Sequence, residues 1–130
     1  RIKPGLETLP KLKGHSSPIL CLALCSEVNY LLSGDRDGLV IVWDCSSLTH
    51  VHTFIAHRLA VTGICCPRSG TEVFTCSKDK TVKIWNLTEL AFVETIYGHE
   101  MSVSAVCALS PTRCLSVGED KTMRLSKVVE

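Results

Sequence analysis

Apolar residues in this chain gather in short runs separated by turn-forming residues. The runs are rich in valine, isoleucine, leucine, threonine and cysteine, with glycine, proline, serine, asparagine or aspartate between them. That composition is typical of strands rather than helices. The runs cover residues 19–24, 30–33, 39–43, 51–55, 61–66, 72–76, 81–85 and 92–96. The pattern therefore predicts an all-β fold built from short strands.

The runs recur along the chain with a fixed period. His15, His57 and His99 follow one another at intervals of 42 residues, each at the start of a new set of runs. A one-residue deletion near positions 111–113 shortens the third set, in a stretch that reads as a turn. A period of this length predicts a repeat architecture in which each unit is one small sheet.

We expect three repeats after a short leading segment. Residues 1–13 would hold the last strand of a preceding repeat and a linker, residues 14–55 and 56–97 two full repeats, and residues 98–130 a degenerate, truncated one. The third repeat lacks a fourth apolar run, and Ser126 stands where the other two have tryptophan.

Composition excludes several classes of protein. The net charge of +1, with 45% hydrophobic residues, is that of a globular chain rather than a disordered or strongly basic one. No apolar run approaches the roughly 20 residues of a membrane span, so we expect a soluble, intracellular chain. Eight cysteines lie mostly in apolar runs without a C-x-x-C pair, which favours buried, reduced thiols and no metal site.

The repeat signature resembles the WD40 family. Each unit opens on Gly-His or Ala-His, the first closes on Trp43-Asp44 and the second on Trp85-Asn86, and four strands lie between these marks. The resemblance implies a β-propeller with one four-stranded blade per repeat. A propeller typically closes with 4–8 blades, so three blades would form part of a larger ring, for which seven blades are expected. An alternative is closure by two chains that supply six blades.

The resemblance also implies a buried hydrogen-bonded network in each repeat. The matching sets are His15, Ser33, Asp37 and Trp43; His57, Thr75, Asp79 and Trp85; and His99, Ser116 and Asp120, which lack a tryptophan. Indole donates, carboxylate accepts and imidazole does one of each, so the groups satisfy one another without water. The missing donor predicts a turn at Asp120 that is held less firmly than the other two.

A catalytic interpretation of the same residues is weaker. His15, Ser33 and Asp37 are the residue types of a nucleophilic triad, but the set recurs in every repeat, whereas an active site needs one constellation in a cleft. No G-x-S-x-G elbow and no phosphate-binding glycine loop occurs. We therefore expect a protein that is not an enzyme and uses no cofactor or small-molecule substrate.

Candidate binding residues lie in loops that the propeller would place on one face. They are Ser16, Ser17, Arg36, Arg58, Lys78 and Lys80 in the first two repeats, whereas the third offers Glu100, Met101 and Glu119. The first two repeats thus present a basic patch suited to phosphate or an acidic partner. Ordinary solvated charge is the alternative interpretation of each residue by itself.

A closer resemblance is to the WD40 branch found in the U3 small nucleolar ribonucleoprotein. The stretches GHSSPILCLAL, HTFIAHRLAV, KTVKIWN and FVETIYGH carry it, and loop residues such as Arg36 and Arg58 match as well. The resemblance implies a nucleolar protein that binds the box B/C region of U3 RNA beside proteins of box C/D particles and acts in processing of ribosomal RNA precursors. A scaffold that binds only proteins on its propeller face is the alternative.

Overall fold

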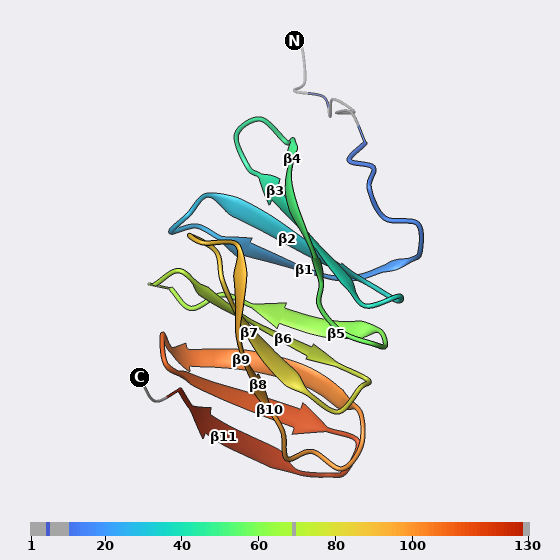
Figure 1. Ribbon diagram of the computed structural model, residues 1–130, viewed down its shortest axis with the longest axis vertical. Coiled ribbons are helices and arrows are strands. Elements are labelled where there is room, and N and C mark those ends of the chain that lie inside the picture. Colours follow the sequence, from blue (N-terminus) through green and yellow to red (C-terminus); the bar gives the residue numbers. More distant parts are fainter. Residues whose placement is uncertain (1–4, 6–10, 69, 129–130) are drawn as a thin grey trace.

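The chain forms three antiparallel β-sheets that lie side by side (Figure 1). The computed structural model describes residues 5, 11–68 and 70–128. The strands of the first sheet are β1 (Ile19–Cys25), β2 (Tyr30–Asp35), β3 (Leu39–Asp44) and β4 (His50–Ile55), in that order. Those of the second are β5 (Val61–Cys65), β6 (Glu72–Ser77), β7 (Val82–Asn86) and β8 (Ala91–Ile96), followed by β9 (Val103–Ser110), β10 (Arg113–Gly118) and β11 (Met123–Lys127) in the third. The all-β prediction is confirmed.

Each sheet falls within one of the expected repeats. The two complete repeats form four-stranded sheets, and the third has three strands among the described residues. The leading strand expected within residues 1–13 lies largely outside the described residues, and positions 5 and 11–13 belong to no strand. The boundaries at residues 14, 56 and 98 stay a prediction.

Strand register confirms where the missing tryptophan would stand. Trp85 on β7 lies opposite Val73 on β6, and Ser126 on β11 lies opposite Cys114 on β10. The two pairs occupy the same place in their sheets, since the one-residue deletion falls in the turn before β10. The third sheet therefore keeps the strand of the signature and loses its largest side chain.

The hydrophobic core consists of two clusters, one between the first and second sheets and one between the second and third. Strand β6 contributes side chains to both. Val73 faces the first sheet while the next residue, Phe74, faces the third, as strand alternation requires. Each is fully buried. The cluster between the first two sheets includes Leu32, Val40, Val42, Phe54, Val61, Ile64, Val73, Trp85 and Leu87. The middle strands of the first two sheets are buried on both faces, as is typical of strands with continuous apolar runs.

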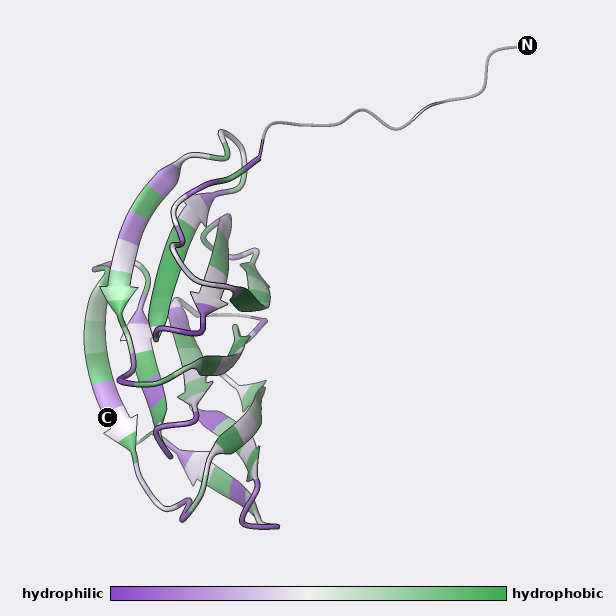
Figure 2. Cartoon of the chain, turned by 90° about the vertical axis from the view of Figure 1, so that its right-hand side faces the viewer, coloured by the Kyte–Doolittle hydropathy of each residue, from purple (hydrophilic) through white to green (hydrophobic). Residues whose placement is uncertain are grey.

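Burial decreases at the outer edge of the first sheet and at the two ends of the stack of sheets. The outermost strand of the first sheet, β4, alternates between hydrophilic and hydrophobic residues along its length (Figure 2). Leu22 and Leu24 on β1 are 64% and 63% exposed, and Met123 and Leu125 on β11 are 67% and 61% exposed. Within the described residues these apolar faces have no further sheet against them, and repeats of this kind need neighbours to bury both faces.

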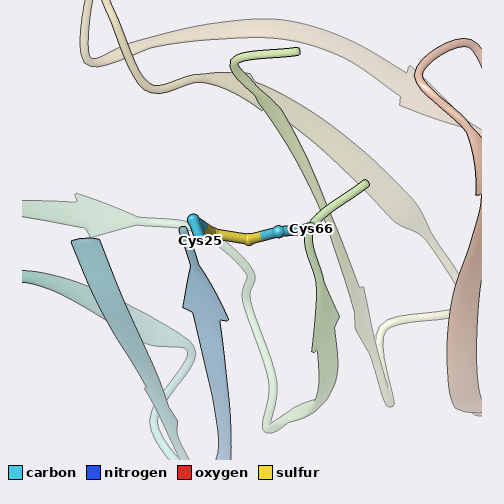
Figure 3. The surroundings of a disulfide bond; sticks show 2 residues. All are labelled: Cys25 and Cys66. Atoms are coloured by element: carbon cyan, nitrogen blue, oxygen red, sulfur yellow. A yellow bond between two sulfur atoms is a disulfide. The ribbon is translucent and has the colours of Figure 1, made fainter. Parts of the chain in front are cut away.

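The expectation that all cysteines are reduced is wrong for one pair. A disulfide joins Cys25, at the end of β1, to Cys66, just after β5 (Figure 3). Their Cα atoms are 5.4 Å apart, because the ends of these neighbouring strands approach each other. Among the free cysteines, burial raises the pKa of the Cys65 thiol to about 12 and that of Cys114 to about 11, so both stay protonated at neutral pH.

Candidate functional site

The second repeat contains the expected network in full. Nδ1 of His57 donates to Asp79 Oδ2 at 2.8 Å, and Nε2 accepts from the Thr75 hydroxyl at 2.8 Å, an assignment that gives each group a compatible role. The indole of Trp85 donates to the same hydroxyl oxygen at 3.0 Å. These side chains thereby join strands β6 and β7, the turn between them and the loop before β5.

The first repeat uses a different aspartate from the one predicted. Nδ1 of His15 lies 2.7 Å from Asp35 Oδ2, and Asp35 is fully buried, whereas Asp37 is exposed. Ser33 bonds Nε2 of His15 at 2.6 Å and accepts from Trp43 at 2.9 Å, as expected. Asp37 is therefore wrong as a network residue, and Asp35 takes its place.

The reason for this exchange lies in the turn between β2 and β3. Its backbone conformation matches that of the equivalent turn in the second repeat. The amide of Gly38 donates a hydrogen bond to the carbonyl of Asp35, as the amide of Lys80 does to the carbonyl of Ser77. The repeats differ in which residue carries the carboxylate. In the first repeat it is Asp35, two residues earlier at the end of β2, and its Oδ1 also accepts a hydrogen bond from the amide of Asp37 at 2.9 Å. The sequence offers two aspartates in this turn, and counting by the repeat period selects the wrong one.

In the third repeat the network lacks its indole donor. His99 Nδ1 lies 3.0 Å from Asp120 Oδ2 and its Nε2 lies 2.8 Å from the Ser116 hydroxyl. Asp120 also accepts from the Thr122 hydroxyl at 2.6 Å and the Glu100 amide at 3.0 Å. The turn is thus still bonded, while Ser116 receives no hydrogen bond from position 126 on β11.

Hydrogen bonding controls the ionisation of these carboxylates. Burial raises the pKa of Asp79, but hydrogen bonds from His57 and Thr81 outweigh it and hold the pKa well below its ordinary value. For Asp120, the hydrogen bond from Thr122 is the largest cause of a lowered pKa. Both imidazole nitrogens and the hydroxyls are occupied within the networks, so these sets hold the fold and leave no free base or nucleophile.

The basic candidate residues lie at one end of the sheets. Arg36 is in the β2–β3 turn, Lys78 and Lys80 in the β6–β7 turn, and Arg58 in the β4–β5 loop, all with exposed side chains. The loop and the second turn meet, because the Arg58 amide donates to Asp79 Oδ2 at 3.4 Å. The shared end of the loops is as predicted, and the binding role stays a prediction.

Two of the candidates meet at a hollow between the second and third sheets, which we call the inter-sheet hollow. Its volume is about 440 Å³, and its walls are formed by Arg58, Asp79, Lys80, Thr81, Lys83, Tyr97, Gly98 and His99. Ser16, Ser17, Arg36 and Lys78 do not line it. Sequence reasoning missed Lys83 and Tyr97, which comparison with Ile41 and Ile55 at the same repeat positions would have singled out.

The described residues contain neither a metal-binding cluster nor a membrane-spanning helix. No cluster of three or more histidine, cysteine, aspartate or glutamate side chains among them is arranged to hold a metal ion. No helix in this part of the chain is long and apolar enough to cross a membrane.

Comparison with known proteins places the fold in a family. The sequence profile of the WD domain, G-beta repeat family (WD40), matches residues 6–44, 48–86 and 90–125. A solved structure of U3-55K is 42% identical with a TM-score of 0.85, over 89% of this chain and 36% of that one. A crystal structure of RRP9 WD40 repeats is also 42% identical, with a TM-score of 0.83, over 87% and 34% of the two chains.

Curated relatives point the same way. U3 small nucleolar RNA-interacting protein 2 of Homo sapiens is 42% identical over 58% of this chain and 15% of its own length. The U3 snoRNP-associated protein-like YAO of Arabidopsis thaliana is 45% identical over 93% of this chain. The chain spans only 24% of that protein. The family profile matches all three repeats, and each repeat forms one sheet with a His–Ser/Thr–Asp network. The chain therefore belongs to the WD40 family of G-beta repeat proteins.

Proposed function

We propose that this chain is a non-catalytic, U3 snoRNA-associated part of the U3 small nucleolar ribonucleoprotein. It would act in the nucleolus, in processing of ribosomal RNA precursors and biogenesis of the small ribosomal subunit. The observation that carries the proposal is the extent of the likeness, since 45% identity to a protein named for U3 snoRNP association spans 93% of the chain. A generic propeller would share the core positions of the repeat without so many of its loops.

The structure supports a contact with the RNA backbone. Arg36, Arg58, Lys78 and Lys80 are exposed at the same end of neighbouring sheets, in a chain whose net charge is only +1. The positive charge is therefore concentrated at this end of the sheets. Exposed arginine and lysine side chains of nucleic-acid-binding proteins most often contact phosphate groups. Specificity for the box B/C region would come from RNA shape and from box C/D proteins bound beside it, because aromatic residues make up only 5% of the chain.

A nucleolar location bears on the cysteine pair. Nuclear thiol pools keep most cysteines reduced. The proposed function therefore does not depend on the Cys25–Cys66 disulfide, and the hydrophobic contacts between the first two sheets hold them together in its absence.

Recovery of RNA with the full-length protein tests the proposal. We expect U3 snoRNA to be enriched over other box C/D RNAs in gentle purifications from nuclear extract. The double variant Arg36→Glu with Arg58→Glu should lose most of that RNA, with a shallower salt dependence of what remains. Arg68→Glu is the matched control, since Arg68 is equally exposed but lies in the β5–β6 turn at the other end of the sheet.

A protein-binding scaffold is the second candidate function. The near-neutral net charge favours it, because strong nucleic-acid binders are commonly basic over a whole domain. It predicts that ribosome-assembly proteins are recovered with the chain after nuclease treatment and that the arginine double variant changes nothing. Absence of U3 RNA from the untreated purification would contradict the first proposal.

A further inference from the structure

We propose that the inter-sheet hollow binds one nucleotide of single-stranded RNA, with its phosphate on Arg58, Lys80 and Lys83 and its base against Tyr97. The inference rests on the proposed function and deepens it, because it assigns the RNA contact to one place on the chain. The hollow is about 440 Å³, within the range of pockets that hold small ligands.

The hollow has an excess of positive charge. Three cationic side chains line it, from the β4–β5 loop, the β6–β7 turn and strand β7. Among the described residues none of the three cations forms an ion pair with a carboxylate, and Lys83 Nζ lies 5.6 Å from the centroid of the Phe92 ring. Asp79 is in the wall, but its oxygens accept from His57 and Thr81. An anion entering the hollow would meet unneutralised donors.

A fourth cation, Arg124, lies beside Gly98 in the wall of the hollow. Nη1 of Arg124, on β11, lies 3.2 Å from the position that a Cβ would take at Gly98, which lines the hollow. Gly98 has a φ of 141°, a backbone conformation that side chains other than hydrogen rarely adopt. The glycine thus leaves room for the guanidinium beside the wall of the hollow, although Arg124 itself does not line it.

An aromatic ring beside these cations distinguishes RNA from other anionic partners. Tyr97 is 78% exposed, although a ring of this size is usually buried for most of its surface. Base stacking on aromatic rings next to cations is how proteins commonly hold single-stranded nucleic acid. A phosphorylated peptide would use the cations and leave the exposed ring without a role.

The preceding repeat provides an internal comparison. The positions of Arg58, Lys80, Lys83 and Tyr97 are held there by Ser16, Gly38, Ile41 and Ile55. The space is closed as well, because the carbonyl of Gly38 accepts from the amides of Ala56 and His57, each at 3.0 Å. Among the described residues no corresponding bond joins Lys80 to Gly98 or His99. Both the opening and its charge are therefore specific to the second and third sheets.

This comparison supplies variants that the fold already tolerates. Arg58→Ser, Lys80→Gly and Tyr97→Ile each introduce the residue of the preceding repeat, and Gly suits the φ of 75° at position 80. Arg68→Ser is the control, with the same chemical change at the opposite end. Binding of the full-length protein to a short labelled oligouridylate would be measured by fluorescence anisotropy over a range of salt, with inorganic phosphate, uridine monophosphate and a phosphoserine peptide as competitors.

We expect Tyr97→Ile to weaken oligouridylate binding about 5- to 100-fold. Arg58→Ser with Lys80→Gly should lower the salt slope by about 0.7, which is the loss of one phosphate contact on a single strand. Uridine monophosphate should compete better than inorganic phosphate. Unchanged binding in all three variants would overturn the proposal, as would a phosphoserine peptide that outcompetes the RNA. If U3 RNA is still recovered from cells in that case, the proposed function stands and only the hollow is wrong.

Discussion

Nδ1 of His15 lies 2.7 Å from the carboxylate of Asp35, a residue two positions before the aspartate that the repeat period indicates. The same hydroxyl, imidazole and carboxylate thus meet in all three repeats, although the first takes its carboxylate from the end of a strand and not from the middle of a turn. The buried imidazole needs an acceptor at this point, and the backbone can supply it from either position.

This relationship predicts a large effect for one substitution and almost none for a second one two residues away. Asp35→Asn removes the charge that accepts from His15 and from two turn amides, so it should lower the free energy of unfolding by about 1.5–3 kcal/mol. Asp37→Asn should stay within about 0.5 kcal/mol of the parent, since Asp37 is exposed. Urea unfolding measures both, and a larger loss for Asp37→Asn would restore the aspartate predicted from the sequence.

The missing indole predicts a looser third sheet. The amides of Thr81 and Thr122 donate to equivalent carboxylates, at 3.0 and 3.1 Å. We expect Thr122 to exchange its amide hydrogen faster, because Ser116 receives no indole hydrogen bond. Ser126→Trp should slow that exchange by about fivefold, the effect of one hydrogen bond, and Ser126→Phe, which adds bulk without a donor, should not. Equal exchange at the two amides in the parent chain would contradict this account.

Acid should destabilise the chain through its network carboxylates. The pKa values of Asp79 and Asp120 are lowered in the folded state, so folding favours their charged forms. Their contribution is present above the ordinary carboxyl pKa of about 4 and is lost as the pH falls through the lower, folded values. The urea midpoint should thus be level from about pH 7 to 5 and fall below about pH 4. A smaller fall is expected for Asp79→Asn, and a level midpoint at low pH would be inconsistent with the networks.

Backbone strain in the third sheet offers a stabilising substitution. Lys121 has a φ of 66° at the turn position where the first repeat has Gly38. Lys121→Gly should raise the free energy of unfolding by about 0.5–1 kcal/mol, because relief of left-handed strain exceeds the added entropy of the unfolded chain. Lys127→Gly, at an exposed strand position, should lower it. Thermal unfolding of the two variants compares them directly, and a loss for both would show that the turn is unstrained.

Periodic features of the fold were predictable from the sequence. Strand positions followed from the apolar runs, and Ser126 was placed at the tryptophan position by counting alone, because repeats place equivalent residues in equivalent registers. The network histidines His57 and His99 followed for the same reason. These features depend on local pattern, which a single sequence contains.

Features that depend on contacts between repeats were not predictable. The choice of Asp35 depends on which carboxylate reaches His15 in three dimensions, and the sequence presents both candidates. The inter-sheet hollow depends on bonds that close the first junction at Gly38 and do not form at the second. Cys25 and Cys66 meet because neighbouring strand ends converge, whereas their separation in the sequence carries no sign of it.

Photocrosslinking of the full-length protein to U3 RNA, followed by mapping of the crosslinked peptides, would locate the proposed RNA contact. We expect crosslinks in the β4–β5 loop and the β6–β7 turn, around Arg58 and Lys80, together with Tyr97, which lines the inter-sheet hollow. Crosslinks confined to the opposite end near Arg68, or U3 RNA recovered without any crosslink to these three sheets, would contradict the proposed contact.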